Sequence, residues 1–343
     1  MKVLIPGGSG QVGTVLARQL HADGHDVVVL SRAPKSAPWR TVRWDLADPR
    51  GWQEEIDGAD VVVNLAGRSV NCRYTRKHRE EILTSRVASV QAVGRAIRNA
   101  RRPPALWLQM STATLYAHRY DAPNDEVSGQ IGGELDAPAA WRFSIDVAQA
   151  WEKALDDELT PATRKVKLRS AMVMSPDRGG IFDTLLTLVR CGLGGRIGDG
   201  RQYVSWIHEA DFIRSLYWLI ERDHLDGVVN LAAPHPLPQR EFMAVLRQAW
   251  GTSIALPATK WMLELGAFFL RTETELILKS RRVVPGRLLA DGCSFQYPDW
   301  PAAAQELCRR QSHLPQPRRL LASGESPLLI RSARRHRDNV WRR

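Results

Sequence analysis

The chain has 343 residues, 44% of them hydrophobic, which is enough for one large domain or for a domain with a smaller lobe. This hydrophobic share excludes a wholly disordered protein. The four cysteines, at positions 72, 191, 293 and 308, stand far apart without CxxC or other metal-ligand spacing. We therefore expect reduced thiols, no metal site and a cytoplasmic location.

The net charge of +11 would suit a nucleic-acid-binding protein, but its distribution argues against that class. Residues 314–343 contain eight Arg against Glu325 and Asp338, which gives this segment a net charge of +6. We interpret 308–343 as a basic, solvated and disordered tail, and we expect no specific nucleic-acid partner.

No membrane segment is expected either. Met1 and Lys2 lead directly into the apolar residues 3–5, which predict a first strand and not a signal peptide. The apolar stretch 261–270 is too short to span a bilayer and contains Glu264, so it predicts a buried helix.

The first 175 residues alternate between strand-like and helix-like patterns. Strands are predicted at 2–5, 26–31, 41–46, 60–67, 105–111 and 166–174, and helices at 11–24, 49–57, 76–100 and 141–159. This alternation predicts an α/β fold in which a doubly wound parallel sheet carries helices on both faces.

The pattern changes after residue 175. The predicted elements are a glycine-rich loop at 192–202, a helix at 209–222, a strand at 227–232, a helix at 239–250 and a helical unit at 257–306. We divide the chain into a nucleotide-binding domain, 1–175 with 203–250 partly returning to it, and a smaller C-terminal substrate lobe, 176–202 with 251–307.

The segment GGSGQVG (7–13) follows the first predicted strand and opens the first predicted helix. Gly7, Gly10 and Gly13 are spaced as a dinucleotide-binding loop requires, with Gln11 and Val12 between the last two. Glycines allow the backbone to approach a pyrophosphate, and the helix N-terminus supplies free N–H groups and partial positive charge. We expect all five residues to bind a dinucleotide.

The end of the second predicted strand indicates which dinucleotide. NAD sites place an acidic residue there to bond the ribose 2′-hydroxyl, whereas this chain has Ser31 and Arg32. An arginine can pair with a 2′-phosphate that an acid would repel. The sequence therefore predicts NADP(H), although a solvated arginine is common at strand ends.

Two more strand ends extend the predicted cofactor site. Asp45 and Leu46 close the third strand, where a carboxylate and an apolar side chain could border an adenine. Asn64, Leu65, Ala66 and Gly67 close the fourth strand with small residues where a ribose would pass. Ligands of open α/β sheets bind outside these carboxyl ends.

In its motifs the chain resembles the extended short-chain dehydrogenase/reductase superfamily, the group of NAD(P)-dependent epimerase/dehydratase-like proteins. More narrowly, it resembles a divergent epimerase branch with a C-terminal domain of unknown function. The motifs are GGSGQVG, SR (31–32), NLAG (64–67), EILTSR (81–86), MSTATLY (110–116), AWE (150–152), CGLGG (191–195), GDGRQYVSWIHEAD (198–211), VNLAAPHP (229–236), REF (240–242) and RRVVPGRLLADGCSFQYP (281–298).

The resemblance covers about residues 1–307 and implies a Rossmann domain that binds NADP(H), followed by a substrate lobe. It also implies that Glu81 and Arg86, on the long helix, and Met172, after the sixth strand, approach the cofactor.

Ordinary members of this superfamily use a Tyr-x-x-x-Lys pair, in which the tyrosine transfers the proton and the lysine lowers its pKa and holds the nicotinamide ribose. Here the matching helix offers Phe143 and Val147, and no lysine occurs between Lys77 and Lys153. Thr112 matches the Ser/Thr that polarises the substrate oxygen. Tyr116 is the first candidate for a substitute proton donor, and the alternative is that it is an aromatic residue packed under the loop.

The missing pair leaves two interpretations open. The chain is either an NADP(H)-dependent oxidoreductase or epimerase with substituted acid/base groups, or an NADPH-binding regulatory or scaffold protein without catalysis. For an enzyme, the expected substrate is small and polar, for example sugar-like, and its candidate contacts are Arg201, Gln202, Trp206 and His208. The helices at 76–100 and 141–159 could also form a homodimer.

Overall fold

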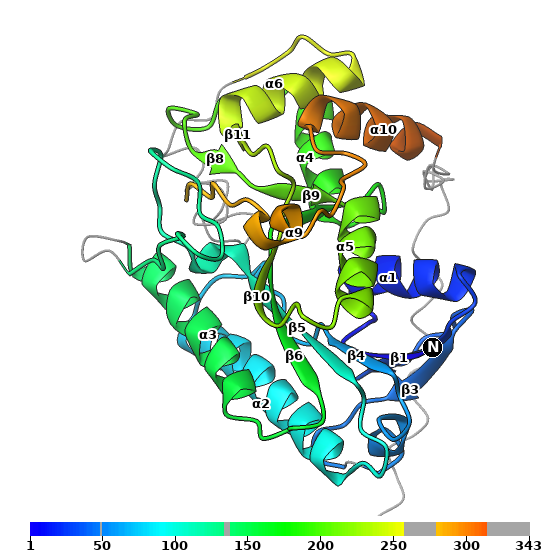
Figure 1. The fold of residues 1–343 in the computed structure, drawn as a ribbon. Helices are drawn as coiled ribbons and strands as arrows, with labels where there is room; N and C mark the ends of the chain where they lie inside the picture. The colour runs from blue at the N-terminus through cyan, green and yellow to red at the C-terminus, as the bar shows by residue number, and fades with distance from the viewer. Residues whose placement is uncertain (49, 134–137, 257–278, 314–343) are drawn as a thin grey trace, which may run out of the picture.

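The computed structural model describes residues 1–48, 50–133, 138–256 and 279–313. A seven-stranded parallel sheet forms its centre, in the order β10-β6-β5-β4-β1-β2-β3 (Figure 1). The strands are β1 (Lys2–Pro6), β2 (Asp26–Ser31), β3 (Arg40–Arg43), β4 (Val61–Asn64), β5 (Leu106–Thr112), β6 (Arg164–Ser170) and β10 (Gly227–Leu231). The chain runs outward from β1 to β3 and returns at β4, so the order switches between β1 and β4.

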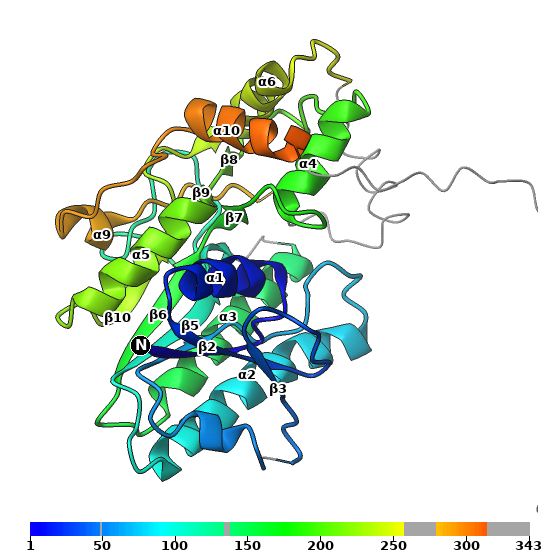
Figure 2. The ribbon, with the colours of Figure 1, turned by 90° about the vertical axis from the view of Figure 1, so that its right-hand side faces the viewer.

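Both faces of the sheet are covered by helices, as the alternation predicted (Figures 1 and 2). Helices α1 (Gln11–Ala22) and α5 (Glu209–Glu221) pack on the face that holds Val3 and Ile5. Helices α2 (Arg76–Asn99) and α3 (Ala139–Asp156) pack on the face that holds Leu4. Each such buried aliphatic side chain contributes roughly 1.5–3 kcal/mol, so these two layers hold the sheet in place.

A smaller layer lies beyond the carboxyl ends of the strands (Figure 1). Its helices α4 (Ile181–Arg190), α6 (Gln239–Trp250) and α10 (Trp300–His313) share one hydrophobic cluster. Trp300 is its centre, because its ring stacks on Phe242 at 4.1 Å and its indole N–H donates to the Phe242 carbonyl at 2.9 Å. The remaining elements are the strand pairs β8 (Tyr203–Val204) with β11 (Leu237–Pro238) and β7 (Met172–Met174) with β9 (Trp206–His208), and the short helices η1 (Gln53–Glu55), η2 (Ala113–Leu115) and α9 (Gly286–Ala290).

The structure differs from the predicted elements at several places. Of residues 50–57, where a helix was expected, only Gln53–Glu55 are helical, and α4, β8, β9 and β11 were not predicted. The third and fourth strands end earlier than expected, at Arg43 and Asn64.

The single strand expected at 166–174 breaks at Ala171, whose N–H donates to Leu231 of the main sheet, and β7 then pairs with β9 in the smaller layer. Apolar residues on both sides of the break hide it from the sequence pattern. Helix α10 also continues to His313, past residue 308 where the tail was expected to begin.

In the described parts of the chain, no helix combines the length and apolar character needed to cross a membrane. The helix expected at 261–270 lies outside the described residues.

Candidate functional site

A cavity of about 600 Å³ lies at the carboxyl ends of β1, β2, β3 and β4, beside the switch in strand order. The predicted cofactor residues that line it are Gly7, Gly10, Ser31, Arg32, Asp45, Leu46, Leu65, Ala66 and Gly67. The other lining residues are Ser9, Leu30, Arg43, Trp44, Arg68, Ser85 and Ser89. Four predicted segments that are distant in the sequence therefore meet at one site.

The glycine loop forms the floor of this cavity. Gly7 has a φ of +76°, and a Cβ added there would lie 2.7 Å from the Cα of Ala66. Gly13 packs against Gly8, whose carbonyl oxygen would be 2.6 Å from an added Cβ. The glycine loop is thus held close to the β4 loop and to the first turn of α1, and Gly10, the N-cap of α1, lines the cavity.

The residues between these glycines lie beside the cavity without lining it. Val12 packs on the core cluster under α1. Gln11 points its amide toward Gly180, at the start of α4, and its Nε2 is buried without a hydrogen-bond partner among the described residues. Gln11 therefore has an unused donor at the junction of the sheet and the smaller layer.

Arg32 and a second arginine, Arg43, also line the cavity. The register of β2 and β3 pairs Ser31 with Arg43, so the side chains of Arg32 and Arg43 extend from neighbouring strand ends. Both are exposed and line the cavity, and Ser31 is fixed by a 2.9 Å hydrogen bond to Ser9. Arg43 was not among the predicted residues, because the third strand was expected to continue to residue 46 and only its register with β2 places Arg43 at the cavity.

Asn64 shapes the cavity wall and is fully buried. Its side-chain amide donates to Gln109 at 2.9 Å, and its Oδ1 accepts the N–H of Ala66 at 3.1 Å. These bonds fix the turn in which Leu65, Ala66 and Gly67 line the cavity. Asn64 itself is therefore a residue that positions this turn.

The three residues implied by the resemblance lie at different depths. Glu81 forms an ion pair with Arg68, which lines the cavity. Arg86 lies behind Gly67, where an added Cβ would be 3.2 Å from the Arg86 Cζ. Met172 lies in β7 against the hydrophobic cluster of the smaller layer, and it is not among the residues that line this cavity.

The two predicted catalytic residues lie at the end of β5 and just beyond it, on either side of the short helix η2. Thr112 is the last residue of the strand, and its Oγ1 accepts the N–H of Thr114 at 3.1 Å. Tyr116 is 2% exposed, and its hydroxyl donates to Asn230 Oδ1 at 2.9 Å. Burial raises the pKa of Tyr116, although Arg169 beside it acts in the opposite direction. This setting is that of a packed aromatic residue.

The four candidate substrate residues do not converge on one point. Arg201 lies over the Tyr120 ring at 5.5 Å, and Gln202 is buried with its amide donating to the carbonyl of Ile197 at 3.2 Å. Trp206 is fully buried with its ring 4.9 Å from that of Trp300.

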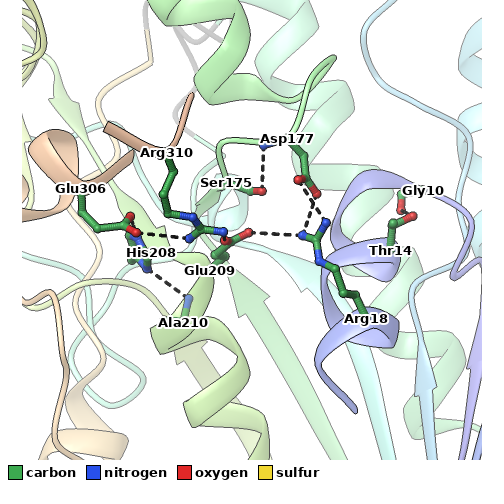
Figure 3. Close-up of polar contacts among 10 residues, drawn as sticks. All are labelled: Gly10, Thr14, Arg18, Ser175, Asp177, His208, Glu209, Ala210, Glu306 and Arg310. Atoms are coloured by element: carbon green, nitrogen blue, oxygen red, sulfur yellow. Dashed lines mark hydrogen bonds and ion pairs between the residues drawn. The ribbon is translucent and has the colours of Figure 1, made fainter. Parts of the chain in front are cut away.

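His208 has two structural partners (Figure 3). Its Nδ1 accepts the N–H of Ala210 at 3.1 Å, which caps α5, so Nε2 carries the proton and donates to Glu306 at 3.0 Å. The imidazole therefore joins the start of α5 to α10.

The face of α3 that carries Phe143 and Val147 meets α2 and the loop before it. The Phe143 ring contacts Tyr74 edge-on at 5.2 Å and lies under Arg79 at 4.9 Å, and Val147 is buried. Neither helix position holds a group that titrates or donates a hydrogen bond.

Two cations from the C-terminal part of the chain reach the end of β5 instead. Lys279 Nζ donates to the carbonyl of Thr114 at 2.7 Å, and Arg281 Nε donates to the Thr114 hydroxyl at 3.2 Å. Neither was predicted from the sequence, because only the packing of the smaller layer brings them to Thr114.

The fold and this cavity define a dinucleotide-binding protein of the Rossmann type. Residues 3–139 match the NAD dependent epimerase/dehydratase family, and residues 258–307 match a domain of unknown function, DUF1731. The human epimerase family protein SDR39U1 is 33% identical over 312 residues, which cover 90% of this chain and 99% of the human protein. The chain therefore belongs to this epimerase family.

Solved structures show the same similarity. The crystal structure of human SDR39U1 (isoform 2) with NADPH has a TM-score of 0.78 and 32% identity, and the match covers 90% of this chain and 99% of that one. A nucleoside-diphosphate sugar epimerase from Corynebacterium glutamicum has a TM-score of 0.69 and 28% identity, over 90% of this chain and 58% of that one.

Proposed function

We propose that this protein is an NADP(H)-dependent oxidoreductase or epimerase that acts on a small polar substrate such as a sugar. One observation carries the proposal: the glycine loop and the arginine pair Arg32 and Arg43 line a single cavity. The close approach of Gly7 to Ala66 leaves the backbone bare where a pyrophosphate would pass. The NADPH in the crystal structure of the human relative supports the same cofactor.

Each cofactor residue has a distinct role in this proposal. The first turn of α1 would hold the pyrophosphate with backbone N–H groups, and Arg32 with Arg43 would pair with the 2′-phosphate. When bound, NADP(H) supplies or accepts a hydride.

On the substrate side, Thr112 would donate a hydrogen bond to the reacting oxygen from the end of β5. Lys279 and Arg281, at Thr114, would stabilise negative charge on that oxygen. Tyr116 stays a candidate proton donor, but its raised pKa and its bond to Asn230 support a positioning role.

The cofactor assignment can be tested by binding alone. We expect Arg32→Ala and Arg43→Ala each to reduce the preference for NADPH over NADH about tenfold, because each removes one cation from the 2′-phosphate. The measurement is a fluorescence titration with each nucleotide. Arg40→Ala is the matched control on the same strand, since Arg40 pairs with Glu55 and does not line the cavity. An unchanged preference in both variants would remove the assignment.

Catalysis needs a separate assay. Purified protein with stoichiometric NADPH should lose absorbance at the nicotinamide band, or exchange label, with at least one member of a panel of ketones, enones and nucleotide sugars. Thr112→Val should abolish that reaction while leaving NADPH affinity unchanged.

A second function remains in competition, that of an NADPH-binding protein without catalysis. The observation that favours it is the face of α3, where Phe143 and buried Val147 occupy the positions of the usual pair. No turnover with any substrate of the panel, together with NADPH binding at full stoichiometry, would support this second function.

A further inference from the structure

A second cavity, of about 420 Å³, adjoins the cofactor cavity. The two cavities share four lining residues, which are Arg32, Leu46, Arg68 and Ser85. The second cavity is completed by three residues of α2, which are Glu81, Thr84 and Ala88. A ligand group bound at Arg32 therefore shares its space with side chains of α2, and one of these is a carboxylate.

The carboxylate of Glu81 would oppose NADP(H) if it were not paired. In NAD sites an acidic side chain bonds the ribose 2′-hydroxyl, and such an acid repels a 2′-phosphate. Glu81 lines a cavity together with Arg32, where the proposed function places the 2′-phosphate. The Glu81 side chain is 37% exposed, so solvent screens its charge only in part. Binding of NADP(H) is therefore favoured when this charge is neutralised.

Arg68 is the cation that neutralises Glu81. Its Nη1 forms an ion pair with Glu81 Oε2, and this carboxylate oxygen is buried. The backbone of Arg68 is held to α2 independently of the pair, because its N–H donates to Ser85 Oγ at 2.9 Å. Arg68 Nε is also buried, without a hydrogen bond to any residue that the structure describes. The pair with Glu81 thus fixes the guanidinium where the two cavities meet.

Lys77 is a second cation near the same carboxylate. Its Nζ lies 4.0 Å from Glu81 Oε1, one helical turn away, and its side chain is 82% exposed. Lys77 is not among the residues that line either cavity. An ion pair this exposed is weak and screened by salt, so it has little effect on a ligand in the cavity. Lys77 is therefore a matched control for Arg68.

We propose that Arg68 sets the preference for NADPH over NADH by neutralising Glu81. This inference rests on the proposed NADP(H) function. Arg32 and Arg43 would attract the 2′-phosphate, whereas Arg68 removes the charge that would repel it. Arg68 acts through Glu81 and is a positioning residue. Without it, the free carboxylate of Glu81 repels the 2′-phosphate of NADPH and can accept a hydrogen bond from the 2′-hydroxyl of NADH.

The test is a double-mutant cycle on the ratio of the NADH Kd to the NADPH Kd, measured by fluorescence titration. In Arg68→Met we expect this ratio to fall about fivefold, because one partly screened negative charge is left beside the 2′-phosphate. Adding Glu81→Gln to Arg68→Met should return the ratio to within about twofold of the wild type, since the pair is again neutral. Lys77→Met should behave as wild type.

The double variant separates this inference from a direct contact between Arg68 and the 2′-phosphate. With a direct contact, the ratio would fall in Arg68→Met and stay low after Glu81→Gln is added, which overturns the role of Glu81. An unchanged ratio in Arg68→Met, or an equal fall in Lys77→Met, also overturns the inference.

Failure of the proposed function gives a different result. Wild-type protein that binds neither nucleotide, or that prefers NADH, overturns the NADP(H) assignment before any variant is compared. The urea midpoint of each variant shows whether it is folded. If Arg68→Met does not fold, Arg68→Gln takes its place in the same cycle, because it also removes the charge.

Discussion

Gly10 and Gly13 lie three residues apart in the same loop, but a methyl group added at each would meet different surroundings. At Gly10 the nearest atom would be the Gly7 carbonyl oxygen at 3.7 Å, which is an ordinary contact. At Gly13 the methyl group would overlap the backbone of Gly8, in a part of the fold that has no room to relax. The two glycines therefore serve different purposes, one at the cofactor and one inside the fold.

A pair of substitutions tests this division at the residue scale. Gly13→Ala should lower the free energy of unfolding by about 1–3 kcal/mol, because it overpacks the contact between α1 and the loop. Gly10→Ala should lower the free energy of unfolding by less than about 1 kcal/mol, because it changes only the N-cap residue of α1. It should weaken NADPH binding, because Gly10 lines the cavity. Urea unfolding and NADPH titration of both variants give the two readouts. Equal losses of stability in the two variants would contradict the packing argument.

At the scale of elements, a chain of charges joins three helices across the two layers (Figure 3). Glu209, at the start of α5, is 6% exposed and pairs with Arg310 of α10 at 2.6 Å. Arg18 of α1 lies 4.0 Å from Glu209 and pairs with Asp177 at 2.8 Å. The helix that opens the cofactor site is thereby connected to the last described helix of the chain.

This arrangement predicts that Arg310 holds α10 in place. Arg310→Met leaves the buried carboxylate of Glu209 with Arg18 alone, so we expect a loss of about 1–2 kcal/mol in the free energy of unfolding, less than for a fully buried pair. Arg309→Met is the matched control, because Arg309 is more exposed and lies 4.0 Å from Glu306. The urea midpoints of the two variants decide the point, and a shift of equal size in both would refute the specific role of Arg310.

At the scale of the whole molecule, local sequence patterns predicted one part of the site, and long-range contacts place the residues that were not predicted. The glycine loop and the pair Ser31–Arg32 were predictable because strand, turn and helix follow one another along the chain. Arg43 reaches the same cavity only through the register of β2 and β3, and Lys279 reaches Thr114 only through the packing of the smaller layer. Single-sequence patterns do not contain these contacts.

The burial of His208 and Trp206 shows where a local sequence pattern predicts the wrong environment. Both stand in a polar, glycine-rich neighbourhood that is typical of a substrate loop, but β9 carries them into the core of the smaller layer. The pairing of β9 with β7 decides this, and it depends on the break at Ala171 that the apolar pattern hides.

The charge of the whole molecule leads to the last prediction. Removal of residues 314–343 takes away eight Arg and two acids, so the net charge falls from +11 to +5. Helix α10 completes its buried face before that point, with Leu307, Cys308 and Gln311. We therefore expect the shortened chain to keep its NADPH affinity and its urea midpoint.

Binding to random-sequence duplex DNA should change instead, because it depends on the number of phosphates that are neutralised. The slope of log affinity against log salt should become shallower by up to about 7, if all eight arginines contact phosphates. An unchanged slope would place the polyanion affinity on the folded part of the chain, and a fall in NADPH affinity would assign residues 314–343 to the cofactor site. Salt titrations of the full and shortened chains, each with and without saturating NADPH, distinguish these results.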